Sequence, residues 1–201
     1  MTVLTNTALI AVASMAAWRL VRHKTRFNLV LFTVFVAAMI IPFQSIMIPM
    51  IKVAKGLGLV NNYLGIMFVY LGFGSSFSIF LFHGFIKGIP LEVEEAAVID
   101  GASPMGVFWG IVFPLLKPIV MTVLVLNVLW TWNDFLLPLL VIPSEEMRTI
   151  PLAINSFFSQ YSKKWDLAMA ALVLAILPVV ALFIAVQKSI IAGIVSGSVK
   201  G

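Results

Sequence analysis

Long apolar stretches separated by short polar links dominate this chain of 201 residues. A helix that crosses a membrane needs roughly 20 mostly apolar residues, because the hydrocarbon core is about 30 Å thick. Stretches of this kind occupy residues 4–21, 27–51, 63–86, 115–137 and 167–186. The pattern predicts an all-α integral membrane protein with about five transmembrane helices.

The positions of the acidic residues agree with this prediction. All of them lie outside the apolar stretches or at their ends: Glu92, Glu94, Glu95, Asp100, Asp134, Glu145, Glu146 and Asp166. Charge at the centre of a bilayer costs several kcal/mol, so true spans avoid it. Of all residues, 62% are hydrophobic and 10% are charged, whereas soluble domains carry about a quarter charged residues. Membrane lipid is therefore expected to be the main solvent.

The basic residues predict which ends of the spans face the cytoplasm. Cytoplasmic links carry an excess of Lys and Arg, and the first link decides the orientation here. Residues 19–26 contain Arg19, Arg22, Lys24 and Arg26. Alternation then places residues 87–114 and 187–201 in the cytoplasm and residues 52–62 and 138–166 outside. We therefore expect the N-terminus outside and the C-terminus in the cytoplasm.

Several classes of function are disfavoured by the composition. The net charge of +5 does not indicate nucleic-acid binding, because the basic residues lie at span ends. The chain has no cysteine and only two histidines, His23 and His83, which argues against a metal site. An intramembrane enzyme needs a nucleophile–base pair or metal ligands at depth, and an ion-coupled secondary carrier needs carboxylates or histidines there. The spans offer neither away from their ends, so no catalytic or metal-binding residue is predicted.

The link between the third and fourth stretches, residues 87–114, carries the most specific motif. Its residues are Glu95, Ala96, Ala97, Gly101, Ile111 and Pro114. Three residues separate the alanines from the glycine, nine separate the glycine from the isoleucine, and two precede the proline. This spacing resembles the EAA loop of ATP-binding-cassette (ABC) importer permeases, in which Leu is usual at the position of Phe113. The resemblance implies a cytoplasmic loop that docks the membrane channel onto an ATPase.

Local signals in this loop predict two short helices. We expect them over residues 91–100 and 104–112, with a corner at Gly101, where a helix end favours a left-handed residue. Ser103 is a good N-cap for the second helix, and Pro104 suits its first position. The pattern therefore predicts a helix–glycine–helix unit rather than an irregular link.

The residue types in the first helix suit a docking role. Ala96 and Ala97 are small enough to let the helix sit deep in a groove of a partner. Glu95 and Asp100 are candidates for pairs with basic residues on the groove walls. The alternative is an interfacial hairpin that merely links two spans, and the full match of spacings argues against it.

Two further segments resemble the carbohydrate-importing, maltose-type branch of the same permeases. Trp132-Asn133-Asp134-Phe135 is similar to a Trp-Asn-Glu/Asp-Phe segment of that branch, and residues 193–201 resemble its glycine-rich Val-Lys-Gly ending. The resemblance runs from Thr5 to Gly201 and begins inside what corresponds to the second span of the family. The whole chain, residues 1–201, is thus expected to be an importer transmembrane domain that lacks the first family span, through loss of that span or a late start codon.

The resemblance also implies partners. A second homologous permease, a dimer of ABC ATPases, an extracytoplasmic solute-binding protein and a sugar are expected, in a bacterial inner (plasma) membrane. This chain has no Gly-x-x-x-x-Gly-Lys-Ser/Thr phosphate loop, so ATP and Mg²⁺ are expected in the ATPase and no cofactor in this chain. The runner-up is an importer of another solute, such as spermidine, phosphate or an amino acid.

Candidate residues of the substrate path are polar or aromatic groups within the spans. They are Gln44, Asn127, Trp130, Asn133 and Asp134. Polar groups near the midplane usually face a bundle interior or a pathway, so Asn127 either lines the path or bonds a neighbouring helix. Trp130 either stacks on a sugar ring or belongs to the interfacial aromatic belt.

The other candidates also carry two interpretations. Gln44 lies between Pro42 and Pro49, and such breaks often line a cavity, although a kinked helix packed on its neighbour fits equally. Asn133 and Asp134 reach the outer boundary of their span, where they either contact the sugar or the binding protein or simply end the helix.

Overall fold

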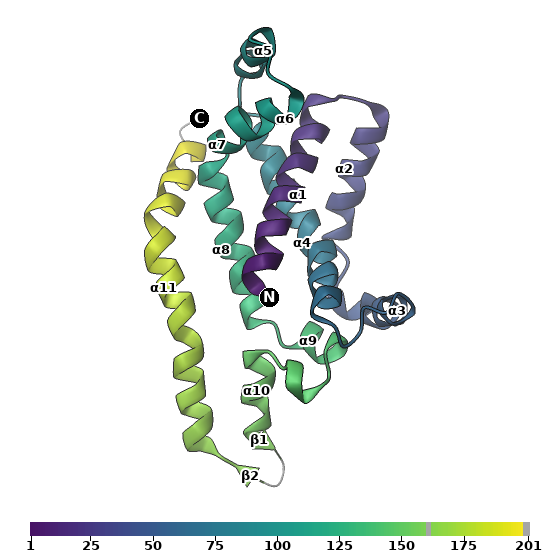
Figure 1. Ribbon diagram of the computed structural model, residues 1–201, viewed down its shortest axis with the longest axis vertical. Coiled ribbons are helices and arrows are strands. Elements are labelled where there is room, and N and C mark those ends of the chain that lie inside the picture. Colours follow the sequence, from purple (N-terminus) through teal and green to yellow (C-terminus); the bar gives the residue numbers. More distant parts are fainter. Residues whose placement is uncertain (160–161, 199–201) are drawn as a thin grey trace.

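The computed structural model describes residues 1–159 and 162–198, and it is built almost entirely from helices that run along its long axis (Figure 1). Three helices form the centre, with α1 (Thr2–Arg22) packed on both α4 (Tyr63–Ile86) and α8 (Lys117–Asn133). Helix α2 (Arg26–Ala38) packs on α4, and α11 (Trp165–Ser198) packs on α8. The predicted all-α architecture is confirmed.

Short elements join the long helices at both ends of the bundle. One end, called here the loop end, carries the α1–α2 turn and α5 (Glu92–Ile99), α6 (Pro104–Val107), the π-helical turn η1 (Phe108–Val112) and α7 (Phe113–Leu115). The other, called the far end, carries α3 (Phe43–Gly56), α9 (Leu136–Val141), the 3₁₀ turn η2 (Glu145–Met147) and α10 (Ile150–Ser156). A two-residue antiparallel pair, β1 (Phe158–Ser159) with β2 (Ser162–Lys163), lies there too. The links predicted to share a side of the membrane thus share an end.

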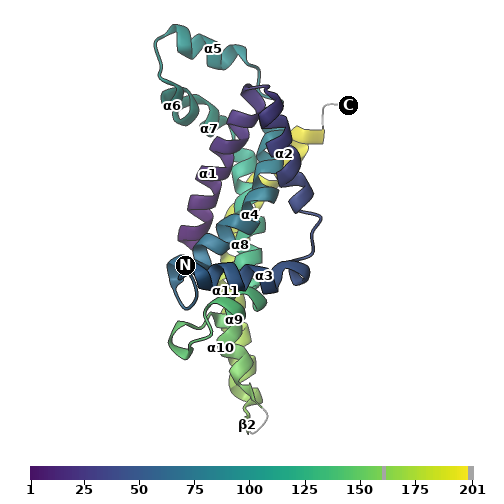
Figure 2. The same ribbon diagram turned by 90° about the vertical axis from the view of Figure 1, so that its right-hand side faces the viewer.

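The first, third and fifth predicted spans are confirmed as α1, α4 and α11. The second is wrong as one continuous helix, because α2 and α3 meet at an angle of 110°. The break follows from Pro42, which has an extended conformation and precedes α3. A proline clashes with the carbonyl four residues earlier, and that residue is Ala38, where α2 ends. Figure 2 shows α3 lying across the long axis of the bundle.

The fourth predicted span, residues 115–137, is also longer than the helix observed. Helix α8 covers Lys117–Asn133 and follows a 76° bend from Pro104–Leu115. At its end Asp134 is extended, and its Oδ1 accepts the backbone N–H groups of Leu136 and Leu137 at 3.1 and 3.4 Å. This local side-chain bonding competes with helix continuation. In the part of the chain that the structure describes, three helices qualify as spans by length and composition, or up to five if each bent pair counts as one.

Buried apolar residues form two clusters, one toward each end. The loop-end cluster joins α1 and α4 to the connecting loop and includes Ala17, Leu20, Val21, Phe82, Ile86, Ile89, Ala97, Val107, Phe108 and Val112. The far-end cluster consists of Ile66, Tyr70, Leu137, Val141 and Ile142. The loop after α4 therefore shares a core with the spans instead of hanging free.

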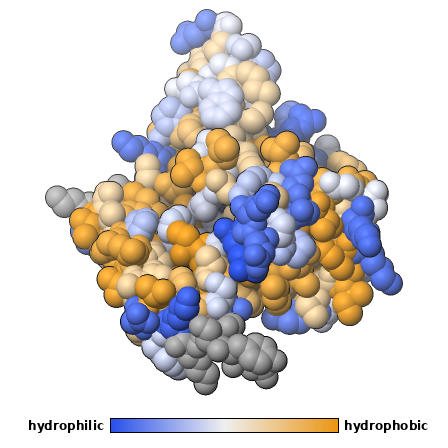
Figure 3. Space-filling model, turned by 60° about the horizontal axis from the view of Figure 1, so that its bottom comes forward, coloured by the Kyte–Doolittle hydropathy of each residue, from blue (hydrophilic) through white to orange (hydrophobic). Residues whose placement is uncertain are grey.

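Much of the outer surface is apolar. Seen with the far end turned forward, broad hydrophobic areas surround scattered hydrophilic side chains (Figure 3). Helix α11 is the extreme case, because none of its most apolar 18-residue window is buried by the rest of the chain. Such a surface requires lipid or another apolar protein around it. Of the glycine-rich tail, residues 199–201 lie outside the described residues.

Candidate functional site

The candidate site is the tip of the molecule at the loop end. Helix α5 lies beyond the ends of α1 and α2, with its axis across the bundle (Figures 1 and 2). It packs on α6 and η1. The two short helices predicted from the sequence are confirmed: α5 covers Glu92–Ile99, and α6 continues through η1 to Val112.

The corner between the two helices is a Schellman motif. Gly101 has φ +86°, a conformation that glycine adopts without strain. Its N–H donates to the carbonyl of Val98 at 3.0 Å, and the N–H of Ala102 donates to that of Ala97 at 2.9 Å. These two bonds satisfy carbonyls that would otherwise be free at the end of α5. The glycine of the motif therefore sets the direction in which the chain leaves α5.

The second helix of the loop has an N-cap and continues into a π-helical turn. Ser103 accepts the N–H of Gly106 at 3.2 Å, and Pro104 occupies the first turn, as predicted. The N–H of Phe113 then reaches back five residues to Phe108. Pro114 supplies the reason, because a proline offers no N–H to the carbonyl of Gly110 and its ring would collide with it. Half-buried Ile111 packs against the loop-end cluster at this turn.

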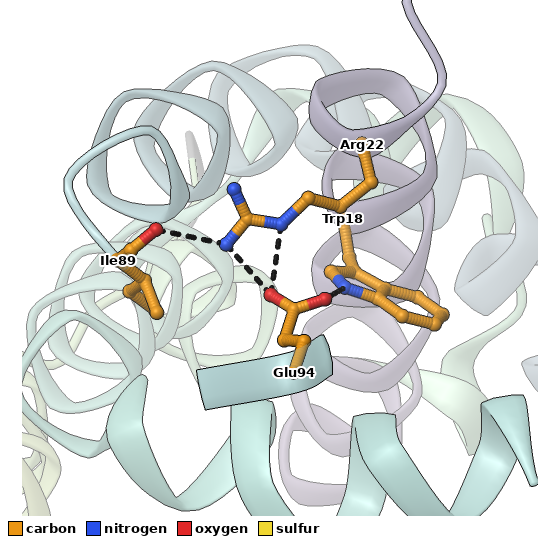
Figure 4. Close-up of polar contacts among 4 residues, drawn as sticks. All are labelled: Trp18, Arg22, Ile89 and Glu94. Carbon is orange, nitrogen blue, oxygen red and sulfur yellow. Dashed lines mark hydrogen bonds and ion pairs between the residues drawn. The ribbon is translucent and has the colours of Figure 1, made fainter. Parts of the chain in front are cut away.

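A buried carboxylate ties α5 to α1 (Figure 4). Glu94 is 6% exposed. Its Oε1 accepts a hydrogen bond from Nε of Arg22 at 2.8 Å and forms an ion pair with Nη2 of the same residue at 2.6 Å. Its Oε2 accepts the indole N–H of Trp18 at 2.8 Å. The same guanidinium donates to the carbonyl of Ile89 at 3.0 Å. Both carboxylate oxygens thus have partners on the last turns of α1.

The remaining residues of α5 divide into one inward and several outward positions. Ala97 is buried in the loop-end cluster. The exposed residues include Glu95, Ala96, Val98, Ile99, Asp100 and Gly101. Val98 and Ile99 are 60% and 85% exposed, which is unusual for apolar side chains on a loop outside the spans. A groove of about 450 Å³ runs beside them between α1 and the α5–α6 corner. The motif therefore presents an apolar surface with acidic residues at its edge.

Asn127 lies in the interface between α8 and α4. It is 3% exposed, and its amide donates to Ser78 Oγ at 3.1 Å and to the carbonyl of Val123 at 3.0 Å. Thr131 bonds the carbonyl of Asn127 and accepts the amide of Asn6 on α1 at 3.1 Å. A chain of polar side chains thus links the three central helices, and the side-chain amide of Asn127 forms its hydrogen bonds within the protein.

Trp130 and Asp134 meet through Tyr70, a residue that the sequence did not single out. The Tyr70 hydroxyl donates to Asp134 Oδ2 at 3.0 Å, and the two rings of Tyr70 and Trp130 meet edge to face, 5.4 Å apart. Asn133 is exposed, and its amide donates to the carbonyl of Leu129 at 2.8 Å. The structure therefore joins Trp130 and Asp134 but leaves Asn133 outside this group.

A cavity of about 820 Å³ lies in the angle between α2, α3 and α4. Trp130 lines it, together with Ser76 and Gly72. Gln44 is exposed on α3 and is not part of this lining. Among the described residues, no group of three or more His, Asp or Glu side chains is placed to hold a metal ion.

Sequence reasoning missed the residues that hold the loop in place. The sequence indicates Glu94 only as one of several acids early in a helix, and Arg22 only as a signal of orientation. The pair is separated by 72 residues, so no local pattern predicts it. The available signals were a basic residue at the end of the first span and an acidic residue in the link after the third span. Neither signal indicates which residue its partner is.

Comparison with known proteins identifies the family. The family described as "Binding-protein-dependent transport system inner membrane component" matches residues 9–195. A probable starch degradation products transport system permease protein, AmyC, of Thermoanaerobacterium thermosulfurigenes is 47% identical over 94% of this chain and 68% of its own length. The melibiose/raffinose/stachyose import permease MelC of Bacillus subtilis is 38% identical over 96% of this chain and 70% of its own.

A solved structure shares the fold. It is a bacterial ABC transporter involved in the import of the acidic polysaccharide alginate; a chain of it superposes with a TM-score of 0.70 and 24% identity, covering 93% of this chain and 72% of that one. The match over nearly the whole chain agrees with the helical architecture described above. This protein therefore belongs to the family of binding-protein-dependent transport system inner membrane components, the membrane permease subunits of ABC transporters.

Proposed function

We propose that this chain is a permease subunit of an ABC importer and forms, with a second homologous permease, the path for an oligosaccharide. The named relatives support a sugar, because one is described as a permease for starch degradation products and another for melibiose, raffinose and stachyose. A solute-binding protein delivers the sugar from outside, and an ATPase dimer binds ATP and Mg²⁺ on the cytoplasmic side. The loop end is then cytoplasmic, as the basic residues of the α1–α2 turn favour.

The observation that carries this proposal is the exposed face of α5. Val98 and Ile99 lie on a helix outside the spans, at the tip of the molecule. Exposed apolar groups of this kind mark interaction sites. Glu95 and Asp100 flank them and suit basic residues of a partner. Docking of the ATPase on this face explains why the EAA motif shapes the α5–α6 corner.

For the sugar path, the strongest candidate is Trp130. It is partly exposed and lines the cavity between α2, α3 and α4 beside Ser76. Aromatic side chains such as Trp130 stack on the apolar faces of sugar rings, and protein hydroxyl groups such as that of Ser76 form hydrogen bonds with the hydroxyl groups at the edges of those rings. Gln44, Asn133 and Asp134 are proposed to face the outer part of the path. Asn127 is proposed to act indirectly, by holding α8 against α4.

The test is purification of the tagged chain from its native membrane in mild detergent, followed by identification of co-purifying proteins. An ABC ATPase and a second permease are expected. The complex is then placed in liposomes with its binding protein, and ATP hydrolysis is measured with maltodextrin, raffinose or arabino-oligosaccharide. Stimulation by one of these sugars supports the proposal. Recovery of the chain alone overturns it, and stimulation only by a non-sugar solute replaces the substrate class.

A further inference from the structure

The attachment of α5 to the spans depends on very few side chains. Of the residues in α5, Glu94 and Ala97 are buried. Ala97 offers one methyl group to the loop-end cluster, whereas Glu94 makes bonds to two residues of α1. Apart from the chain connections, the orientation of α5 relative to α1 is therefore set mainly by the Glu94 carboxylate (Figure 4).

The geometry of the contact is specific as well as buried. The side chains of Arg22 and Glu94 are 14% and 7% exposed. Nε and Nη2 of Arg22 converge on one carboxylate oxygen, Trp18 takes the other, and Nη2 also holds the Ile89 carbonyl at the start of the loop. A planar guanidinium makes such a fork, whereas a lysine ammonium does not. These contacts fix together four groups from α1, from α5 and from the link between α4 and α5.

Helix α1 is well placed to pass a displacement onward. It packs against α4 along the bundle and also against α8 and α2. Its polar residue Asn6 is linked through Thr131 to α8 near its opposite end. A movement applied to the last turn of α1 is therefore felt by each central span, because packed interiors transmit strain.

We propose that Glu94 is a positioning residue that makes α5 and α1 move as one body, so that displacement of the docked loop becomes displacement of α1. This inference rests on the proposed function. In it, the exposed face of α5 receives the ATPase, while Glu94, on the inward face, passes the movement to the spans. Arg22, expected from its charge to orient the chain in the membrane, has this second role as the partner of Glu94.

The experiment compares Glu94→Gln with Glu92→Gln in the complete reconstituted transporter. Both changes remove one carboxylate from α5, but Glu92 is exposed whereas Glu94 is buried and bonded to α1. In Glu94→Gln, the amide that replaces the carboxylate cannot accept the Trp18 N–H while its oxygen faces Arg22. We expect Glu94→Gln to lower sugar transported per ATP hydrolysed about tenfold, within the range of coupling between distant sites. In Glu94→Gln, complex assembly and ATP hydrolysis are expected to stay near wild type, and Glu92→Gln is expected to keep the wild-type ratio of sugar transported to ATP hydrolysed.

Arg22→Lys provides a second variant that keeps the charge. It should also lower the transport-to-hydrolysis ratio, by less than Glu94→Gln. Equal falls in assembly, hydrolysis and transport would show a merely structural role and overturn the inference, as would a Glu94→Gln ratio equal to that of Glu92→Gln. Failure of the proposed function is distinguishable, because the wild-type chain would then bind no ATPase.

A distance measurement keeps the test valid if a variant assembles poorly. The chain contains no cysteine, so spin labels can be attached at Arg19→Cys and Glu92→Cys, both exposed positions. In the single chain in nanodiscs, we expect a narrow distance distribution that broadens when Glu94→Gln is added. An unchanged distribution would contradict the inference.

Discussion

At the loop end the carboxylate of Glu94 is paired with a guanidinium, whereas at the far end the carboxylate of Asp134 accepts hydrogen bonds only from neutral donors. Those donors are the Tyr70 hydroxyl and the N–H groups of Leu136 and Leu137. Both carboxylates accept charge-assisted hydrogen bonds, but the guanidinium at Glu94 adds a second charge and a fixed fork geometry. The loop end is therefore built as one rigid unit, while the far end is held by weaker contacts that are easier to rearrange.

The two ends also differ in the reason why each requires a glycine. Gly101 at the loop end is needed for its backbone conformation, since a Cβ there would meet nothing within 4 Å. Gly65 at the far end is needed for space, since its Cβ would lie 1.8 Å from the carbonyl oxygen of Leu59. The far end thus relies on close approach of backbone segments, and the loop end on side-chain charge and a turn.

The largest effect is expected from breaking the ion pair. Arg22→Ala should lower the free energy of unfolding by about 3 kcal/mol, because it leaves the Glu94 charge buried without its partner. Arg19→Ala, an exposed arginine one turn earlier, is the control and should be nearly neutral. Thermal unfolding of the purified variants in detergent measures both. Equal losses would contradict the distinction between the two arginines.

Gly65→Ala tests the far end and should rank second. The added methyl group must displace the backbone of Leu59, and overpacking of this kind costs about 1–3 kcal/mol. Gly72→Ala in the same helix is the matched control, because its Cβ would meet nothing within 4 Å. The same unfolding assay compares them. If both variants unfold at the same temperature, close approach at Gly65 does not stabilise the far end.

Gly101 variants separate conformation from steric fit at the loop end. Gly101→Val should cost about 1–2 kcal/mol, because an L-residue is strained in the left-handed region, and Gly101→Asn should cost less, because Asn tolerates that region. Unfolding and sugar-stimulated ATP hydrolysis are measured for both. A Gly101→Asn variant that is stable but uncoupled would show that the glycine is required for contact with the ATPase instead.

The smallest effect is expected from Tyr70→Phe. It removes the hydrogen bond from the hydroxyl to the Asp134 carboxylate but keeps the ring against Trp130. Because two backbone N–H groups still bind that carboxylate, the loss should be about 1.5 kcal/mol, at the low end for a bond to a charged group. Tyr63→Phe, at an exposed position in the same helix, should change nothing measurable. A loss as large as that of Arg22→Ala would remove the contrast between the two ends. Unfolding in detergent again provides the measurement.

Local signals predicted most of the helical framework and the shape of the loop. The apolar stretches located α1, α4 and α11, and Gly101, Ser103 and Pro104 located the α5–α6 corner, because capping depends on residues a few positions apart. The second span was expected as one stretch with either a break or a kink near Pro42 and Pro49, and the apolar residues on both sides of Pro42 gave no sign that the chain turns by 110° there. Asp134 ended α8 earlier than expected for the same reason.

The sequence by itself determined the class of protein, the positions of α1, α4 and α11 and the helix–glycine–helix shape of the α5–α6 loop, because bilayer thickness and helix capping act over short stretches of chain. Only the tertiary structure decided which residues hold that loop. Glu94 meets Arg22 and Trp18, and Tyr70 meets Asp134, through the packing of helices distant in sequence. Such pairs leave no periodic trace, since their partners are set by how the spans lie against one another.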